Sequence, residues 1–405
     1  MTSLTRVLFS GNSHLWVTDG TAAGTSEISV AGAYSGGVTP QFLTTFRNEV
    51  LFNGDNAAGF QGLWITNGTS AGTLEISVAG AGTGLSFFPM NFTVVGDRVF
   101  FTGGDASGHG ALWITDGTSA GTSEIAIPGA ATTGWGPGSL GALGNKLLFE
   151  DTDAAGKFGL WISDGTSAGT SELAVAGAAA TGLNPYDFTA FGTKVLFNGK
   201  DAAGKVGLWV TDGTAAGTSE IPIANLSTAG FNPGPTELTV FGNKVLFAGT
   251  DTSGTSTLWV TDGTSAGTSE LTVSGADAAN GGVYARELTV LNGKVLFAGQ
   301  DMNHKIGLWT TAVRLPAPPR FLRPRHLTGR TLLPSWATGC SSGPISNYGP
   351  RTARRPTQRK SPAPSIPMVL TPSPPRSARR RRTTSAATGN PMCCCRTPTA
   401  PRKFG

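Results

Sequence analysis

One segment, LWVTDGTAAGTSEI, begins at Leu15 and returns with little change about every 48 to 50 residues. Every copy carries a Leu-Trp pair, and the first six continue with Asp-Gly-Thr or a close variant. The paired tryptophans are Trp16, Trp64, Trp113, Trp161, Trp209, Trp259 and Trp309. Self-similarity at such a fixed period is the sequence signature of repeat architectures. It therefore constrains the fold more than any other feature of the chain.

Each repeat unit contains four runs rich in β-branched and aromatic residues, separated by turn residues. In the fifth unit these runs are Phe188–Phe191, Lys194–Asn198, Val206–Thr211 and Ser219–Ile223. The Gly192-Thr193 pair between the first two runs tolerates the positive φ of a tight hairpin turn. Each unit is therefore expected to form four antiparallel strands.

Four antiparallel strands in about 49 residues predict an all-β fold, a β-propeller, with one repeat per blade. A stacked β-solenoid is the alternative, but its coils are usually shorter and lack paired tight hairpins. The repeated Trp and the Val-Leu-Phe run of the second strand are expected to fill the space between neighbouring blades. Residues 1–312 then form a seven-unit propeller whose first and last units are incomplete.

The motif resembles a bacterial repeat family named for its Glu-Leu-Trp-x-x-Asp-Gly-Thr signature, and the resemblance covers residues 1 to about 312. It implies a large secreted or surface-attached protein, but it names no substrate. This chain departs from the signature before each Leu-Trp pair. In place of glutamate stand His14, Gly62, Ala111, Gly159, Gly207, Thr257 and Gly307.

The composition divides the chain into two parts. Residues 313–405 hold 18 of the 30 Lys and Arg residues, all four cysteines and no acidic residue. The remaining 12 basic and 25 acidic residues give the repeat body a net charge of about −13. A body without thiols is consistent with an extracellular or cell-surface protein. No apolar segment is long enough for a membrane span, and the chain does not start with a signal peptide.

The segment 313–405 is rich in Pro, Arg, Ser and Thr, which is typical of a disordered basic tail. Its onset indicates a different origin, because the seventh repeat breaks off at Ala312. One nucleotide inserted into that codon permits Asp-Gly-Thr-Ala-Ala-Gly-Thr-Ser, and the same frame permits Leu-Trp-Thr-Thr-Asp-Gly-Thr across Asn347 to Gln358. We therefore interpret the tail as out-of-frame translation, and we expect no nucleic-acid binding from its basic residues.

The repeated aspartates raise the question of a calcium site, because Ca²⁺ takes several carboxylate and carbonyl oxygens. The Asp of each Asp-Gly-Thr is expected to accept backbone N–H bonds in its own turn, a role that Asn67 also fits. These residues are Asp19, Asp116, Asp164, Asp212 and Asp262. A second series, Asp55, Asp105, Asp153, Asp201, Asp251 and Asp301, also lies in turn contexts. Only Glu150, Asp151 and Asp153 are dense enough to be calcium candidates, and a solvated loop is the competing interpretation.

The other candidate residues are scattered. His14, His109 and His304 lie shortly before Leu-Trp pairs and would hold a metal only if three blades brought them together; loop histidines are the alternative. Trp135 lies outside the motif, where it would stack on a sugar or pack between blades. The sequence shows no catalytic constellation or cofactor motif.

Near-identical blades favour a multivalent structure, since catalytic sites usually take different residues from different blades. The sequence therefore predicts a non-catalytic secreted or cell-surface scaffold for protein or glycan binding and adhesion. The alternative is a propeller hydrolase or lyase with an acidic, calcium-assisted site at Glu150, Asp151 and Asp153.

Overall fold

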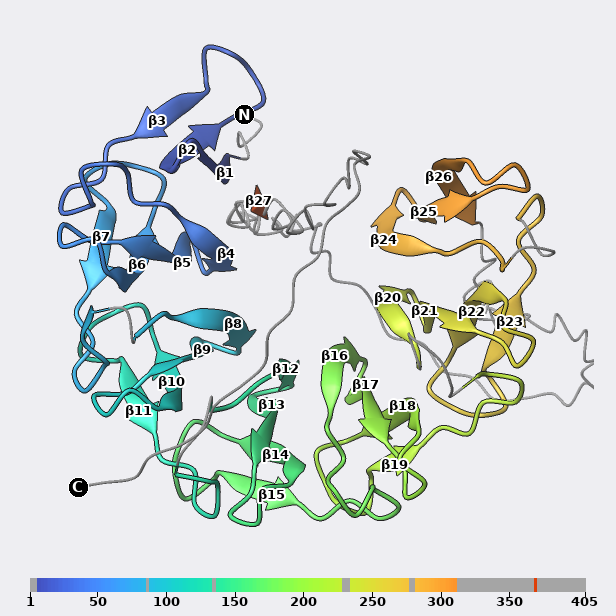
Figure 1. Ribbon diagram of the computed structural model, residues 1–405. Coiled ribbons are helices and arrows are strands. Elements are labelled where there is room, and N and C mark those ends of the chain that lie inside the picture. Colours follow the sequence, from blue (N-terminus) through green and yellow to red (C-terminus); the bar gives the residue numbers. More distant parts are fainter. Residues whose placement is uncertain are drawn as a thin grey trace, which may run out of the picture. The chain divides into compact units, whose positions relative to one another are not determined.

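The computed structural model describes residues 6–84, 87–132, 136–227, 234–276 and 281–311, with the backbone of residues 368–369. All of these residues belong to one compact unit, Met1–Thr371. Their regular structure is entirely β, in seven sheets of three or four strands. Figure 1 shows the sheets following one another along the chain, and we call them blades 1 to 7.

Each blade is built from consecutive antiparallel strands. Their bounds are, for blade 1, β1 (Val7–Gly11), β2 (His14–Thr18) and β3 (Ser26–Ile28); for blade 2, β4 (Gln41–Phe46), β5 (Glu49–Asp55), β6 (Gln61–Thr66) and β7 (Thr73–Ile76); for blade 3, β8 (Met90–Val95), β9 (Arg98–Gly104), β10 (Gly110–Thr115) and β11 (Ser123–Ile125); for blade 4, β12 (Leu140–Leu143), β13 (Lys146–Thr152), β14 (Phe158–Ser163) and β15 (Ser171–Leu173). Blades 5 to 7 contain β16 (Tyr186–Phe191), β17 (Lys194–Lys200), β18 (Val206–Thr211) and β19 (Ser219–Glu220); β20 (Thr236–Phe241), β21 (Lys244–Thr250), β22 (Ser256–Thr261) and β23 (Ser269–Leu271); and β24 (Arg286–Leu291), β25 (Lys294–Gln300) and β26 (Ile306–Thr311). A two-residue strand, β27 (Met368–Val369), pairs in parallel with β1.

The register inside a blade places an aromatic pair at its centre. In blade 2, Phe52 of β5 lies opposite Trp64 of β6, and their rings stack with centroids 6.2 Å apart. The same Phe-Trp pair occurs in all seven blades at 6.2 to 6.4 Å. The indole N–H of Trp64 donates to the Gly54 carbonyl oxygen at 3.0 Å. The repeat therefore fixes the tryptophan by stacking and by one hydrogen bond.

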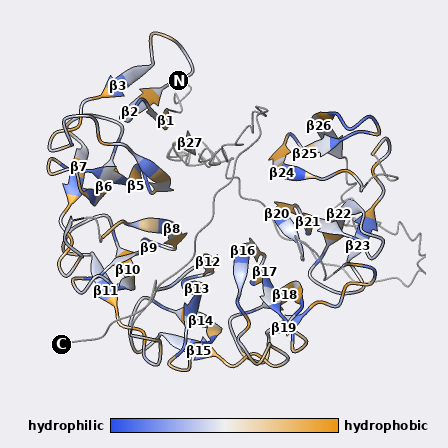
Figure 2. Ribbon diagram, in the orientation of Figure 1, coloured by the Kyte–Doolittle hydropathy of each residue, from blue (hydrophilic) through white to orange (hydrophobic). Residues whose placement is uncertain are grey.

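Neighbouring blades pack through two different faces. The face that carries the Phe-Trp pair, which we call the Trp face, packs against the opposite face of the preceding blade, which we call the Leu face. Between blades 2 and 3, Leu63 of the Leu face and Trp113 of the Trp face share one core and are both 0% exposed. Every later junction repeats this arrangement. Figure 2 shows the hydrophobic segments inside the strands of each blade.

These observations confirm the predicted fold class, a β-propeller of four-stranded antiparallel blades. In the fifth unit, β16 and β17 are longer than predicted and β19 is shorter. The first strand begins earlier because a bulge between Tyr186 and Thr189 lets Tyr186 pair with Asn198. Apart from β27, the predicted disordered tail lies outside the described residues, as does Trp135.

Among the described residues, we find no helix with the length and apolar character needed to cross a membrane.

Candidate functional site

The aspartate of each Asp-Gly-Thr lies in its own turn. Asp212 Oδ1 accepts the Thr214 backbone N–H at 2.9 Å and the Thr214 hydroxyl at 2.7 Å. Asn67 accepts the same two bonds from Thr69. Mainly because of the threonine hydroxyl, the pKa values of these carboxyls lie below their usual range, as shown by Asp19, Asp116, Asp164, Asp212 and Asp262. Each aspartate accepts hydrogen bonds within its own turn, so the carboxylate oxygens of different blades do not converge on a common point.

The second acidic series lies in the turn between the second and third strands. Asp201 Oδ1 accepts the backbone N–H groups of Ala203 and Lys205 at 2.9 and 2.8 Å. In blade 2 this position belongs to Asn56, which bonds Ala58 and Phe60 in the same way, whereas Asp55 ends strand β5. The sequence alignment of Asp55 with this series was therefore wrong by one residue.

A shallow groove recurs beside the third and fourth strands of several blades. It is lined by the residue before Leu-Trp, by the glutamate of the fourth strand and by the apolar residues that follow it. At Gly159 and Gly207 an added Cβ would overlap the carboxylate of Glu172 or Glu220. At these two positions the fourth-strand glutamate therefore occupies the space over the glycine.

Burial and a turn aspartate raise the pKa of these groove glutamates. Burial is the larger cause at Glu124, Glu172 and Glu220, and the nearby charges of Asp105, Asp153 and Asp201 add to it. In blades 3, 4 and 5 the fourth-strand glutamate therefore holds its proton more firmly than a free side chain does.

Blade 4 departs from the repeat in its second strand. Glu150 and Asp151 occupy the positions of Asn198 and Gly199 in blade 5. Asp151 pairs with Gly159, and every other blade has glycine at this position: Gly11, Gly54, Gly103, Gly199, Gly249 and Gly299. Blade 4 therefore carries a carboxyl group where the repeat otherwise has no side chain.

Glu150 and Asp151 belong to opposite faces of blade 4, because successive side chains in a strand alternate. Phe149, which shares the face of Asp151, packs in the core toward blade 3. Leu148, which shares the face of Glu150, packs in the core toward blade 5. The two adjacent carboxyls therefore do not form one site.

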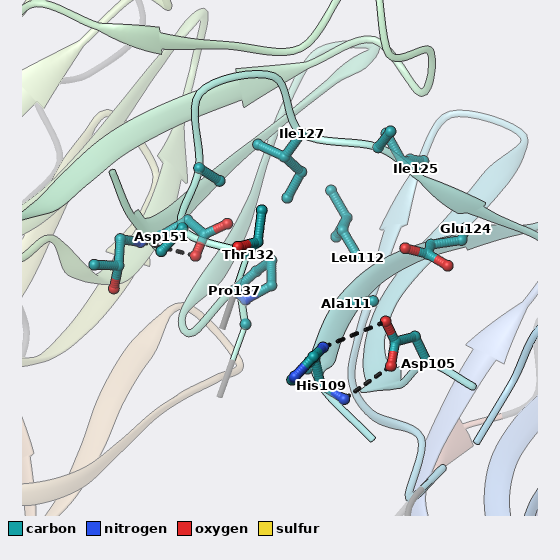
Figure 3. A pocket seen from close by; sticks show the side chains of 16 residues that line it. Asp105, His109, Ala111, Leu112, Glu124, Ile125, Ile127, Thr132, Pro137 and Asp151 are labelled. Carbon is teal, nitrogen blue, oxygen red and sulfur yellow. Dashed lines mark hydrogen bonds and ion pairs between the residues drawn. The ribbon is translucent and has the colours of Figure 1, made fainter. Parts of the chain in front are cut away.

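Asp151 lines a cavity of about 310 Å³ between blades 3 and 4. Figure 3 shows Asp105, His109 and Glu124 on one side of this cavity and Asp151 on the other, with Pro137 and Thr132 between them in the view. We call this cavity the acidic pocket.

The pocket holds one histidine in contact with an aspartate. Asp105 Oδ1 accepts the His109 backbone N–H at 2.8 Å, and Asp105 Oδ2 lies 3.9 Å from His109 Nδ1. The backbone bond fixes the carboxylate, and the imidazole ring lies beside it. Asp105 is thus a positioning residue for His109.

Two carboxyls in blade 4 have raised pKa values. Asp151 is 6% exposed, and its burial raises its pKa to about 6 although the Thr152 backbone N–H donates to Oδ1 at 2.8 Å. Burial, and then the charge of Asp151, raise the pKa of Glu150 to about 7. Such values allow a carboxyl to exchange a proton near neutral pH, which is what general acid-base chemistry requires.

The calcium candidates are not brought together. Glu150 and Asp151 lie on opposite faces, and Asp153 Oδ1 accepts the Ala155 and Lys157 backbone N–H groups in its turn at 2.8 Å each. Within the part of the chain that the structure describes, no three His, Cys, Asp or Glu side chains gather closely enough to hold a metal ion.

The three candidate histidines lie in three different blades. His14 contacts Glu27 at 2.9 Å, His109 faces Asp105, and His304 Nδ1 lies 3.0 Å from Gln300 Nε2. The three histidines therefore have separate partners and do not gather around one metal ion. His109 lies in the acidic pocket, where it can act on a bound molecule.

Sequence reasoning singled out Asp151, His109 and Asp105 separately and missed that they line one pocket. The signal in the sequence was the glycine position: aligning the repeats by register shows that Asp151 alone replaces glycine there.

Comparison with known proteins identifies no family. No family model matches the chain, and no curated protein matches it. Solved structures do match. A puromycin hydrolase, as an S511A mutant complexed with PGG, is 14% identical over 76% of this chain and 52% of its own, with a TM-score of 0.45. A puromycin-hydrolyzing peptidase of Mycobacterium tuberculosis is 12% identical over 73% of this chain and 50% of its own, with a TM-score of 0.44. A Pyrococcus horikoshii acylaminoacyl peptidase is 9% identical over 73% of this chain and 46% of its own, with a TM-score of 0.41.

These matches correct the predicted function. The interpretation of the chain as a non-catalytic scaffold for binding and adhesion was wrong, because the matching structures are hydrolytic enzymes. The chain spans about half the length of the structures that it matches. At such identities and TM-scores no substrate and no residue role passes to this chain, so the function below is argued from its own side chains.

Proposed function

We propose that the chain is a hydrolase whose acid-base chemistry takes place in the acidic pocket between blades 3 and 4. The observation that carries the proposal is Asp151, a buried carboxyl with a pKa of about 6 at a position that is glycine in every other blade. Burying a carboxyl without an ionic partner costs stability. Because blade 4 alone retains this destabilising carboxyl, we infer that the group has a function there.

The reaction needs one group that accepts a proton and one that donates a proton. Ionised Asp151 removes a proton from a water molecule, which attacks the substrate in the pocket. The His109 imidazole, which lies beside Asp105, donates a proton to the leaving group as the substrate bond breaks. The next exchange with solvent returns both groups to their starting states.

The pocket also restricts the substrate. Asp105, Glu124 and Asp151 supply three carboxyls and His109 the one basic side chain, so neutral or cationic groups are favoured over anionic ones. The volume of about 310 Å³ accommodates a single residue of a polymer. We propose a segment of a protein or a glycan as the substrate.

We further propose an extracellular or cell-surface location for this hydrolase. The proposal rests on the cysteine-free repeat body and on the resemblance to the secreted repeat family. Its test is protease treatment of intact cells: degradation of the protein supports the location, and full protection contradicts it.

The activity is tested with wild-type protein on chromogenic peptide and glycoside panels as a function of pH. Asp151→Gly restores the residue of the other six blades, so it removes the carboxyl without an expected loss of fold. We expect it to lower kcat by about a hundredfold or more. Glu172→Gln, in the separate groove beside the third and fourth strands of blade 4, is the matched control and is expected to retain activity.

The pH dependence separates chemistry from structure. Activity should rise as Asp151 ionises around pH 6, and this step should disappear in Asp151→Gly. Wild-type kcat and an unchanged pH profile in that variant would refute the proposed site.

A further inference from the structure

The acidic pocket holds carboxyls that no lysine or arginine balances in the part of the chain that the structure describes. Glu124 and Asp105 line one side, where burial and then the charge of Asp105 raise the pKa of Glu124. Asp151 lines the other side and is 6% exposed. Of these three described carboxyls, only Asp105 lies within ion-pair distance of a basic side chain, and that side chain, His109, is charged only when it is protonated.

The groove of blade 4 shows how the repeat elsewhere balances such a pair. Burial and the charge of Asp153 raise the pKa of Glu172, and the charge of Lys157 lowers it. Lys157 follows Asp153 by four positions, and blades 5 and 7 have lysine at the same place, Lys205 and Lys305. In blade 3 this position is His109. The acidic pocket therefore keeps the pair of carboxyls without the lysine.

The third carboxyl distinguishes this pocket from the other grooves without a lysine. Blades 2 and 6 have Phe60 and Thr255 at the position of Lys157, but their grooves are not lined by a counterpart of Asp151. A cation that enters the acidic pocket is attracted by carboxylates on two of its sides. The partner that the pocket lacks is therefore a positive charge from a bound molecule.

The pocket also selects the shape of the group that carries this charge. Its lining includes the apolar side chains of Ala111, Leu112 and Ile127, which Figure 3 shows between Glu124 and Asp151 in the view. Lysine and arginine pack their methylene stems on apolar surface and keep the charged end beside polar groups. A volume of about 310 Å³ accommodates one such side chain.

We propose that the acidic pocket hydrolyses a peptide bond beside a lysine or arginine residue, and that Glu124 binds the basic side chain. This inference rests on the proposed hydrolase function and narrows its substrate to a basic segment of a protein. In the reaction, the water oxygen bonds to the carbonyl carbon and the C–N bond breaks. Asp151 takes a proton from the water, and His109 gives one to the leaving nitrogen. Glu124 determines specificity and transfers no proton.

The first test measures hydrolysis by the full-length chain of the p-nitroanilides of N-acetyl-lysine, N-acetyl-arginine, N-acetyl-norleucine and N-acetyl-glutamate. Norleucine matches the lysine stem without its ammonium group. We expect kcat/KM to be about tenfold or more higher for the two basic substrates than for norleucine, and lowest for glutamate.

Glu124→Gln should reduce the preference for basic substrates about tenfold, mainly through a higher KM. Glu172→Gln, which removes the corresponding carboxyl from the groove of blade 4, is the matched control and should keep the preference. Equal cleavage of the basic and norleucine substrates, or a preference that Glu124→Gln leaves intact, would overturn the inference and leave the hydrolase function standing.

A second measurement needs no catalysis and so separates this inference from the proposed function. Isothermal titration of wild type with N-acetyl-lysine amide and N-acetyl-norleucine amide should show about tenfold or more tighter binding of the lysine compound, and Glu124→Gln should remove the difference. If no p-nitroanilide is cleaved but this binding is found, the hydrolase function fails and the site for a basic side chain is supported. Equal binding of the two amides contradicts the site itself.

Discussion

Replacing Asp151 with glycine is expected to change stability in a way that depends on pH. The folded pKa of Asp151 is about 6, against 3.8 for the free side chain. At 1.36 kcal/mol per pKa unit, the difference corresponds to about 3 kcal/mol. Asp151 is 6% exposed, so solvent screens little of this effect.

The sign follows from which state binds the proton more tightly. The folded state does, so wild type loses stability as pH rises from about 4 to above 6, where the cost is complete. The variant lacks this cost. It loses the Thr152 hydrogen bond, about 1 kcal/mol, and gains backbone freedom in the unfolded state, about 0.5 to 1 kcal/mol. Asp151→Gly should therefore be less stable than wild type by about 2 kcal/mol at pH 4 and more stable by about 1 kcal/mol at pH 8.

Urea unfolding of both proteins at a series of pH values measures this difference. Asp212→Asn is the control, because Thr214 holds the pKa of Asp212 below its usual value. Its contribution is present at neutral pH and is lost as pH falls, so the control should show the opposite trend. A stability difference between Asp151→Gly and wild type that does not change with pH would refute the assigned burial of the carboxyl.

Three further predictions test the blades and the chain end. Trp209→Ala should lower the free energy of unfolding by about 3 to 5 kcal/mol, because Trp209 is buried against blade 4. Trp16→Ala should lower it by clearly less, because Trp16 is partly exposed. Equal losses in urea unfolding would contradict the face assignment. Gly159→Glu should lower the free energy of unfolding by about 1 to 3 kcal/mol, because the new side chain overlaps Glu172. If the two carboxylates compete for one space, adding Glu172→Gly to this variant should restore much of the lost stability. Sequencing the DNA around codon 312 should reveal a missing nucleotide; an intact frame that keeps the tail in other isolates would disprove it.

Most of the fold could be predicted because the same local structural preferences recur in the seven repeat units. Strand runs, Gly-containing hairpin turns and a fixed tryptophan agree in every unit, and blades that cannot bury both faces alone must stack. The bulge at Tyr186 and the shift from Asp55 to Asn56 could not be predicted, because each depends on pairing with a strand that the local pattern does not specify.

The candidate site could be predicted only as separate residues. Asp151 and Glu150 are adjacent in sequence, which suggested a shared ion site, yet strand alternation sends them toward different blades. Asp151 and His109 are 42 positions apart in the sequence and share a pocket because blade 4 packs on blade 3. Their proximity arises from the junction between blades, about which the order of residues inside a unit says nothing.

The repeat itself now serves as the reference against which chemistry is detected. The second strand carries a glycine next to the tryptophan ring, and a side chain added there would contact a neighbouring residue. A Cβ at Gly199 would lie 2.8 Å from Leu183 and 3.1 Å from the Trp209 ring. Seven copies of one unit therefore provide an internal control for this position, and Asp151 is the single exception. The same comparison singles out Asp105 among the turn aspartates, because it lies beside His109 in the pocket that Asp151 lines. Departure from the repeat at a costly, buried position thus identifies the site better than the density of acidic residues does.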